Sequence, residues 1–197
     1  MRSLSASVWL EEVNAGFINE LKKTVRIKDA HGNLVALPDN AFIIRKPEEE
    51  FKFETFPCIS IYCRNFRHDI LRYNPNPVVM ERDTEHNIAV LEDQAVPFNL
   101  NYQIDFWAKF QTDRDDMTRT WLLRHFRQFN LPVVDDGGIE RDCNVLSVGS
   151  LMSSDLIQDD SHIFRSIANY RIWVEIDDEV RYNMPMVTDI DFTVNPS

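Results

Sequence analysis

The sequence predicts an α+β fold, in which an antiparallel sheet of about four or five strands packs against two main helices and an extended C-terminal tail follows. Apolar and polar side chains alternate from Phe98 to Phe110, the pattern of a strand with one covered face. Strands of parallel sheets are usually apolar on both sides, so this alternation favours antiparallel pairing. Segments 3–24 and 113–129 instead repeat apolar residues every three or four positions, as helices do.

The chain is long enough for one domain with a substantial core. It has 197 residues, and its hydrophobic fraction of 44% is typical of a folded globular protein. We therefore expect a single domain over residues 1–177 and an extended C-terminal arm over residues 178–197.

The N-terminal part begins with a predicted helix from Ser3 to Thr24. Its apolar stripe comprises Leu10, Val13, Phe17, Ile18 and Leu21. A tight turn at His31–Gly32–Asn33 and a short strand at Phe42–Ile44 follow.

The middle of the chain combines strands with a second helix. A strand is predicted from Cys58 to Arg64, and the prolines of the next segment predict an excursion from Asn74 to Asn87. After the alternating strand, Thr112 or Asp113 is expected to cap a helix from Asp113 to Phe129, which Leu131–Pro132 ends.

The C-terminal part is predicted to be extended. Residues 133–144 are expected to form a turn region, and Val145–Ile176 a strand hairpin. Few helix signals occur from Asp178 to Ser197.

Charge and motifs argue against several function classes. The net charge of −11, without a basic stripe, argues against nucleic acid and anionic membrane as tight partners. The cysteines and histidines lack zinc-site spacing, and neither a nucleophile elbow nor a nucleotide-binding loop occurs, so we expect no cofactor, no metal and no catalytic residue. His125 is interpreted as a structural histidine near a helix end. Paired aspartates near turns leave a metal-dependent hydrolase as an alternative.

Two tryptophans lie on the polar sides of predicted strands. Trp107 and Trp173 occupy polar positions of their alternating segments, which predicts that this second sheet face is also covered. Either the N-terminal helix or the long excursion covers it, or another subunit does, because tryptophan, tyrosine and methionine are typical of interface cores. The interface residues expected under the second alternative are Trp107, Trp173, Tyr182, Met184, Met186 and Phe192.

The order of these elements resembles the tail terminator proteins of tailed bacteriophages. The resemblance is carried by the N-terminal helix, the strand starting "PCISI" at Pro57, the alternating strand, the helix Asp113–Phe129 and the hairpin Val145–Ile176. It implies a non-enzymatic ring, usually of six subunits, at the head-proximal end of the tail.

A ring of this kind would end polymerisation of the tail and join it to the neck. The implied partners are other copies of the chain, the tail tube and possibly sheath protein, and a neck or connector protein, with DNA only passing through the lumen and no membrane contact. The implied location is the virion, after assembly in the host cytoplasm. An assembly adaptor of a contractile injection machine is a further alternative.

Overall fold

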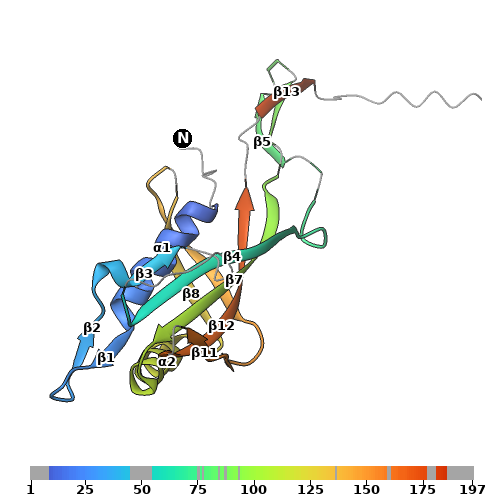
Figure 1. The fold of residues 1–197 in the computed structure, drawn as a ribbon. Helices are drawn as coiled ribbons and strands as arrows, with labels where there is room; N and C mark the ends of the chain where they lie inside the picture. The colour runs from blue at the N-terminus through green and yellow to red at the C-terminus, as the bar shows by residue number, and fades with distance from the viewer. Residues whose placement is uncertain are drawn as a thin grey trace, which may run out of the picture.

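The computed structural model describes residues 9–44, residues 55–176 except 75, 77, 84, 87, 93, 136, 159 and 160, and the backbone of 181–185. This part of the chain contains two α-helices, α1 (Leu10–Thr24) and α2 (Gln111–His125), and strands arranged in three sheets (Figure 1). The predicted α+β class with two main helices is thus confirmed for the described residues.

The central sheet has eight strands. Six follow the order β3-β4-β7-β12-β9-β8, and β10 and β11 also pair with β12. Their bounds are β3 (Phe42–Ile44), β4 (Cys58–His68), β7 (Val96–Ala108), β8 (Gln128–Val134), β9 (Glu140–Ser147), β10 (Met152–Ser153), β11 (Leu156–Gln158) and β12 (Ser161–Ile176).

The prediction of an antiparallel sheet of four or five strands is wrong in two respects: the sheet has more strands, and its strands do not all run antiparallel. The β3 strand runs parallel to β4, whereas the other pairs of this sheet are antiparallel, so the sheet is mixed. Alternation in Phe98–Phe110 described the long β4–β7–β12 ladder well, but a three-residue edge strand such as β3 is too short to reveal its direction.

Two smaller sheets flank the central one. A hairpin joins β1 (Arg26–Lys28) to β2 (Leu34–Ala36), and a short 3₁₀ helix (Asp39–Ala41) precedes β3. The third sheet has the order β13-β6-β5, from β5 (Val78–Asp83), β6 (Ile88–Glu92) and β13 (Arg181–Pro185). It lies beyond the end of β12, at the top of Figure 1, whereas α2 lies at the bottom.

Both helices pack on the same face of the central sheet. Phe17 of α1 contacts Tyr102 of β7 with ring centroids 5.1 Å apart, and Trp121 of α2 meets Tyr170 of β12 edge-on. These side chains are fully buried. The α1 helix also lies directly on β8, because a Cβ added at Gly16 would lie 3.0 Å from the carbonyl oxygen of Pro132.

The region after α2 differs most from the prediction. The helix ends at His125 rather than Phe129, and 128–134 and 140–147 pair as β8 and β9. Leu131 and Val133 face the core while their neighbours are more exposed. Pro132 ends no helix; it is tolerated because β8 is an edge strand.

Other boundaries also shift. The β4 strand continues to His68, beyond the predicted end at Arg64. The α2 helix begins at Gln111 after Phe110, so Thr112 and Asp113 lie in its first turn, and neither is the residue before the helix. Within the described residues, no helix has both the length and the apolar character needed to span a membrane.

Candidate interaction surfaces

The second face of the central sheet is closed over at one end. Trp107 lies there, directly opposite Cys58 of β4 and Arg165 of β12 in the strand register, and only 2% of its surface is exposed. Its indole N–H donates to the hydroxyl of Ser60 at 2.9 Å. The burial of Trp107 is therefore achieved within a single chain, and shielding by a second copy is not needed to explain it.

A buried charge pair organises this end of the second face. Asp105 is fully buried and lies 3.1 Å from Nη2 of Arg165, while the side-chain amide of Gln103 donates to the same carboxylate at 2.8 Å. The Arg165 guanidinium also stacks over the Trp107 ring at 4.5 Å. Burial raises the pKa of Asp105, and the nearby Arg165 opposes that rise. We name Ser60, Gln103, Asp105, Trp107 and Arg165 the polar cluster.

The other end of the same face is less completely buried. Trp173 is half-buried and pairs in register with Asn99. The side-chain oxygens of Asn99 and Asn169 are buried without a hydrogen-bond partner among the described residues. Asn99 lies opposite Trp173 in the register, whereas Asn169 lies opposite Gln103. A buried acceptor such as that of Asn99 beside an indole fits a surface that a partner completes. The interface role of Trp173 stays a prediction, as does that of Trp107.

Two of the predicted C-terminal interface residues lie in a strand of the third sheet. Tyr182 and Met184 belong to β13, whose backbone pairs with Leu91 and Ala89 of β6 in the third sheet. Met186 and Phe192 lie outside the described residues. Their interface role, and the division of the chain between a domain and an arm at residue 177, stay predictions.

His125 lies in a buried aromatic cluster where both helices meet the sheet. Its ring stacks on Trp121 with centroids 3.9 Å apart, and its Nε2 lies 3.3 Å from Oε1 of Glu20 on α1. Burial lowers its pKa, and the backbone carbonyl of Trp121 and the Glu20 carboxylate oppose this effect. Trp121 also donates to the Tyr170 hydroxyl at 2.6 Å. The contacts fit the structural role predicted for this histidine.

Possible metal ligands and thiols are dispersed in the part of the chain that the structure describes. There, no three His, Cys, Asp or Glu side chains are grouped so that they could hold a metal ion. Burial raises the pKa of Cys58 to about 12 and that of Cys143 to about 11, so both thiols stay protonated near neutral pH.

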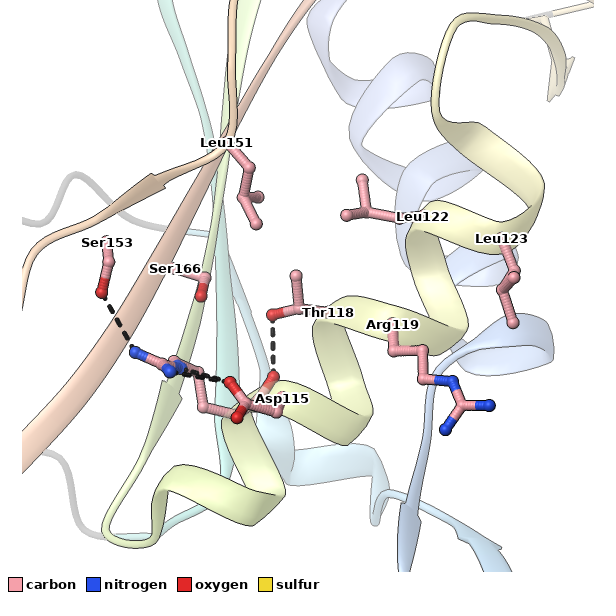
Figure 2. Close-up of a pocket in the computed structure, with 9 residues that line it drawn as sticks. Asp115, Thr118, Arg119, Leu122, Leu123, Leu151, Ser153 and Ser166 are labelled. Atoms are coloured by element: carbon pink, nitrogen blue, oxygen red, sulfur yellow. Dashed lines mark hydrogen bonds and ion pairs between the residues drawn. The ribbon is translucent and has the colours of Figure 1, made fainter.

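A groove lies between α2 and the β10 side of the sheet (Figure 2). Its volume is about 500 Å³, and Leu122 and Leu151 face each other across it, above Thr118. One rim is held by Arg114, which donates to Ser153 at 3.0 Å and pairs with Asp115 at 2.7 Å. We name this site the α2 groove; its lining residues are Arg114, Asp115, Thr118, Arg119, Leu122, Leu123, Leu151, Ser153 and Ser166.

A projecting turn lies at the opposite end of the β4–β7 pair. Residues 69–73, here named the apical turn, follow β4, and the side chains of Ile70 and Leu71 are 75% and 97% exposed. The turn is nevertheless held in place, because Asp69 N–H donates to the Pro97 carbonyl at 2.8 Å and Arg72 pairs with Glu175 at 2.7 Å.

Comparison with known proteins finds a related fold but no family by sequence. No protein-family model and no curated protein matches this chain. Among solved structures, it is similar to a chain from the cryo-EM structure of an extracellular contractile injection system, the PVC sheath/tube terminator in its extended state, with a TM-score of 0.56 and 15% identity. The match covers 97% of this chain and 65% of that chain.

The fold of this chain is similar to that of the matched terminator chain. At this low identity the likeness concerns the fold alone, and the chain spans 65% of the length of the matched one. It nevertheless supports, at the level of fold, the resemblance inferred from the order of the sequence elements.

Three features of these surfaces were missed by reasoning from the sequence. The polar cluster, the α2 groove and the apical turn each depend on contacts between distant segments. A signal existed for the turn: Ile70 and Leu71 form an apolar pair between Asp69 and Arg72, where a polar turn is expected. For the groove, Leu123 lies outside the apolar stripe predicted for its helix and is 77% exposed. That predicted stripe comprises Met117, Trp121, Leu122, Phe126 and Phe129.

Proposed function

We propose that this protein is a structural, non-enzymatic terminator component of a phage tail or of a related contractile injection particle. In this role it forms a ring, hexameric as in the resemblance drawn above, at the end of the tail. The ring ends growth of the tube or sheath and offers a surface to the neck. Its partners are further copies of itself, the tube or sheath protein, and a neck protein.

One observation carries this proposal: the fold likeness to a sheath/tube terminator extends over 97% of the chain. A match of this extent includes both helices and the central sheet, so it is not confined to one common motif. The printed name of that protein describes a sheath/tube terminator in an extracellular injection system, and we extend that role to this chain as a hypothesis.

The exposed apolar groups of the described surface support an assembling protein. Leu71, beyond the His68 end of β4, and Leu123, on α2, are largely exposed, and exposed apolar side chains that gather around a groove or on an anchored turn mark interaction sites. A finite ring needs a contact between two different surfaces of the same chain that closes by rotation.

The test is assembly with a purified tail tube. We expect mass photometry to find rings of the chain, either alone or on addition of tube protein, and electron microscopy to find them at one end of the tubes. We also expect tube lengthening to stop when the chain is added. A chain that stays monomeric, binds neither tube nor sheath ends and leaves tube growth unchanged would overturn the proposal.

A further inference from the structure

We propose that residues 186–197 of one copy bind, as an extended acidic segment, across the open part of the second sheet face of a neighbouring copy. The receiving surface, here named the asparagine patch, comprises Arg67, Asn99, Asn144, Asn169, Arg171 and Trp173. This inference deepens the proposed function, because it names one contact between the copies of a ring. It rests on that function only for the ring, since the contact between two copies can be measured directly.

The asparagine patch spans four strands at the end of the second face away from the polar cluster. Arg67 of β4 lies opposite Asn99 of β7, and Asn99 lies opposite Trp173 of β12. Continuing the register of β12 with β9 places Asn144 beside Trp173. The other two members lie two and four residues before Trp173 on β12, and alternate residues of a strand share one face.

The two arginines of the patch lack counter-charges. Arg67 is exposed, and neither it nor Arg171 forms an ion pair with another described residue. Arg171 donates to the side-chain oxygen of Asn101, but over a long distance of 3.4 Å. The patch therefore carries two positive charges without a partner, in a chain whose net charge is −11.

The acidic residues next to the patch do not neutralise these charges. Glu175, the next residue of β12 on this face, is already paired with Arg72 at 2.7 Å. Asp142 of β9 lies four residues from Leu146, the register partner of Arg171, which is about 13 Å along a strand. An acidic segment is therefore the complementary ligand for the patch.

The asparagines of the patch favour an extended backbone as that ligand. The side-chain oxygens of Asn99, Asn144 and Asn169 are buried, and none accepts a hydrogen bond in the described part of the chain. By contrast, Asn101 in the neighbouring row both donates and accepts within the face. An unpaired buried acceptor is unfavourable, and rotation of an asparagine amide can turn its oxygen toward a bound N–H group. An extended segment offers N–H and C=O groups, and an asparagine amide bonds to both kinds.

Residues 186–197 have the chemistry that the patch lacks. They include two aspartates, Asp189 and Asp191, and neither lysine nor arginine. In an extended chain these carboxylates are about 7 Å apart, and the two arginines come from β4 and β12, about 10 Å apart with β7 between them, so flexible side chains can bridge the difference. Ile190 and Phe192 supply apolar side chains for the half-buried indole of Trp173.

The course of β13 favours a neighbouring copy over the same chain. Arg181 pairs with Glu92, four residues before β7 begins at Val96, whereas Pro185 pairs with Ile88 at the other end of β6. Pro185 is thus about 13 Å further along a strand that starts near the central sheet. Because the third sheet lies beyond the end of β12 (Figure 1), residue 186 follows a strand that projects from the central body. A contact between this segment and the next copy's patch is heterologous, and such contacts form rings when their rotation closes.

The first experiment measures self-association of the full chain by sedimentation. R67E/R171E and D189K/D191K should each weaken it about tenfold or more, because like charges then face each other across the contact. The combined variant R67E/R171E/D189K/D191K should regain most of the association, because opposite charges are restored. The matched control R119E reverses an exposed arginine of α2 and should leave association unchanged. Association that is insensitive to either reversal, or a wild type that stays monomeric, would overturn the contact.

The second experiment separates loss of binding from loss of folding. A fluorescent synthetic peptide of residues 186–197 is titrated with the full chain, and its anisotropy should rise with wild type and with R119E. Binding to R67E should be weaker, and this exposed substitution should leave the melting temperature close to that of wild type. A matched peptide with D189K/D191K should lose binding to wild type. Failure of the first peptide to bind, or equal binding of both peptides, would overturn the contact, and so would a segment seated on its own chain, which would exclude the peptide.

The outcomes separate this inference from the proposed function. If the wild type caps tubes and R67E/R171E caps them equally well with unchanged self-association, the contact is wrong and the terminator function stands. If charge reversal and its restoration change self-association as expected but the wild type leaves tube growth unchanged, the contact stands and the terminator function is wrong. If R67E/R171E loses tube binding while its self-association is unchanged, the patch receives tube protein and the contact between copies is wrong.

Discussion

The two faces of the central sheet are buried by different means. On the helix-covered face, large side chains such as Phe17, Tyr102 and Trp121 exclude water through apolar area. On the second face, the polar cluster closes around a charge pair: Asp105 is fully buried against Arg165, and the Arg165 guanidinium lies over the Trp107 ring. The same strand, β7, contributes alternate residues to both faces.

This difference explains why a tryptophan stands among polar residues. Trp107 supplies both the apolar area that keeps water from Asp105 and an N–H that orients Ser60, whose hydroxyl lies 3.4 Å from the carboxylate. Substitutions on the helix-covered face should therefore lower the free energy of unfolding according to the side-chain volume that they remove. Substitutions on the second face should lower it according to whether they leave a buried charge unpaired.

The largest effect is expected from Trp121→Ala on the helix-covered face. The substitution removes a fully buried ring and the donor to Tyr170, so the free energy of unfolding should fall by about 3–5 kcal/mol. Urea denaturation of the purified chain measures this loss. The neighbouring Leu123→Ala, at a side chain that is mostly exposed, should change it by no more than about 0.5 kcal/mol. Similar losses for both variants would contradict the packing described.

The contribution of the polar cluster to stability should depend on the pairing of its charges and not on side-chain volume. Asp105→Leu leaves Arg165 unpaired, and since 14% of that side chain is exposed, we expect a loss near the lower end for a buried pair, about 3 kcal/mol. The double variant Asp105→Leu/Arg165→Met should recover most of this loss, because no charge is then left buried alone. A double-mutant cycle by urea denaturation measures the coupling, and simple additivity of the two losses would contradict it.

Sequence patterns predicted the helices and strands correctly where a periodic pattern extends over many residues. The alternation of Phe98–Phe110 correctly identified β7, and the three- and four-residue spacing identified both helices. The β8 strand was missed, and β9 was predicted only from Val145 onward, because Phe129 continues the apolar spacing of α2 across a change of element. In addition, Leu131–Pro132 was taken as the end of a helix and not as part of an edge strand.

The surfaces were less predictable than the elements. Alternation placed Trp107 and Trp173 on one face, as the register of β7 with β12 confirms, but it could not tell which end of that face is closed within the chain. Burial of Asp105 depends on Ser60 and Arg165, which are 45 and 60 residues away in sequence. No local pattern encodes such a contact.

A smaller effect should distinguish the two tryptophans of the second face. Trp107→Phe removes the donor to Ser60 and leaves a small void, so the unfolding free energy should fall by about 1–2 kcal/mol. Trp173→Phe, at a half-buried position, should change it less and should instead weaken assembly if a partner covers that end of the face. Thermal melts of dilute chain, compared with sedimentation at high concentration, separate the two effects. Equal destabilisation by both variants would show that the face is closed along its whole length.

The smallest expected effect is a pH dependence that differs between the faces. Burial lowers the pKa of His125 below its ordinary value of about 6.5, so the unfolded chain binds the proton more tightly than the folded chain does. Stability from this group is therefore complete above about pH 6.5 and is lost as the pH falls below it. Asp105 acts in the opposite sense, because its raised pKa makes stability decrease as the pH rises above the ordinary aspartate range. His125→Gln should flatten the rise of unfolding free energy with pH between about 5 and 7, measured by urea denaturation, whereas Asp105→Asn removes the opposing decrease that begins above the ordinary aspartate range. An unchanged slope in His125→Gln would mean that the helix-covered face is held by packing alone and that its histidine does not titrate on unfolding.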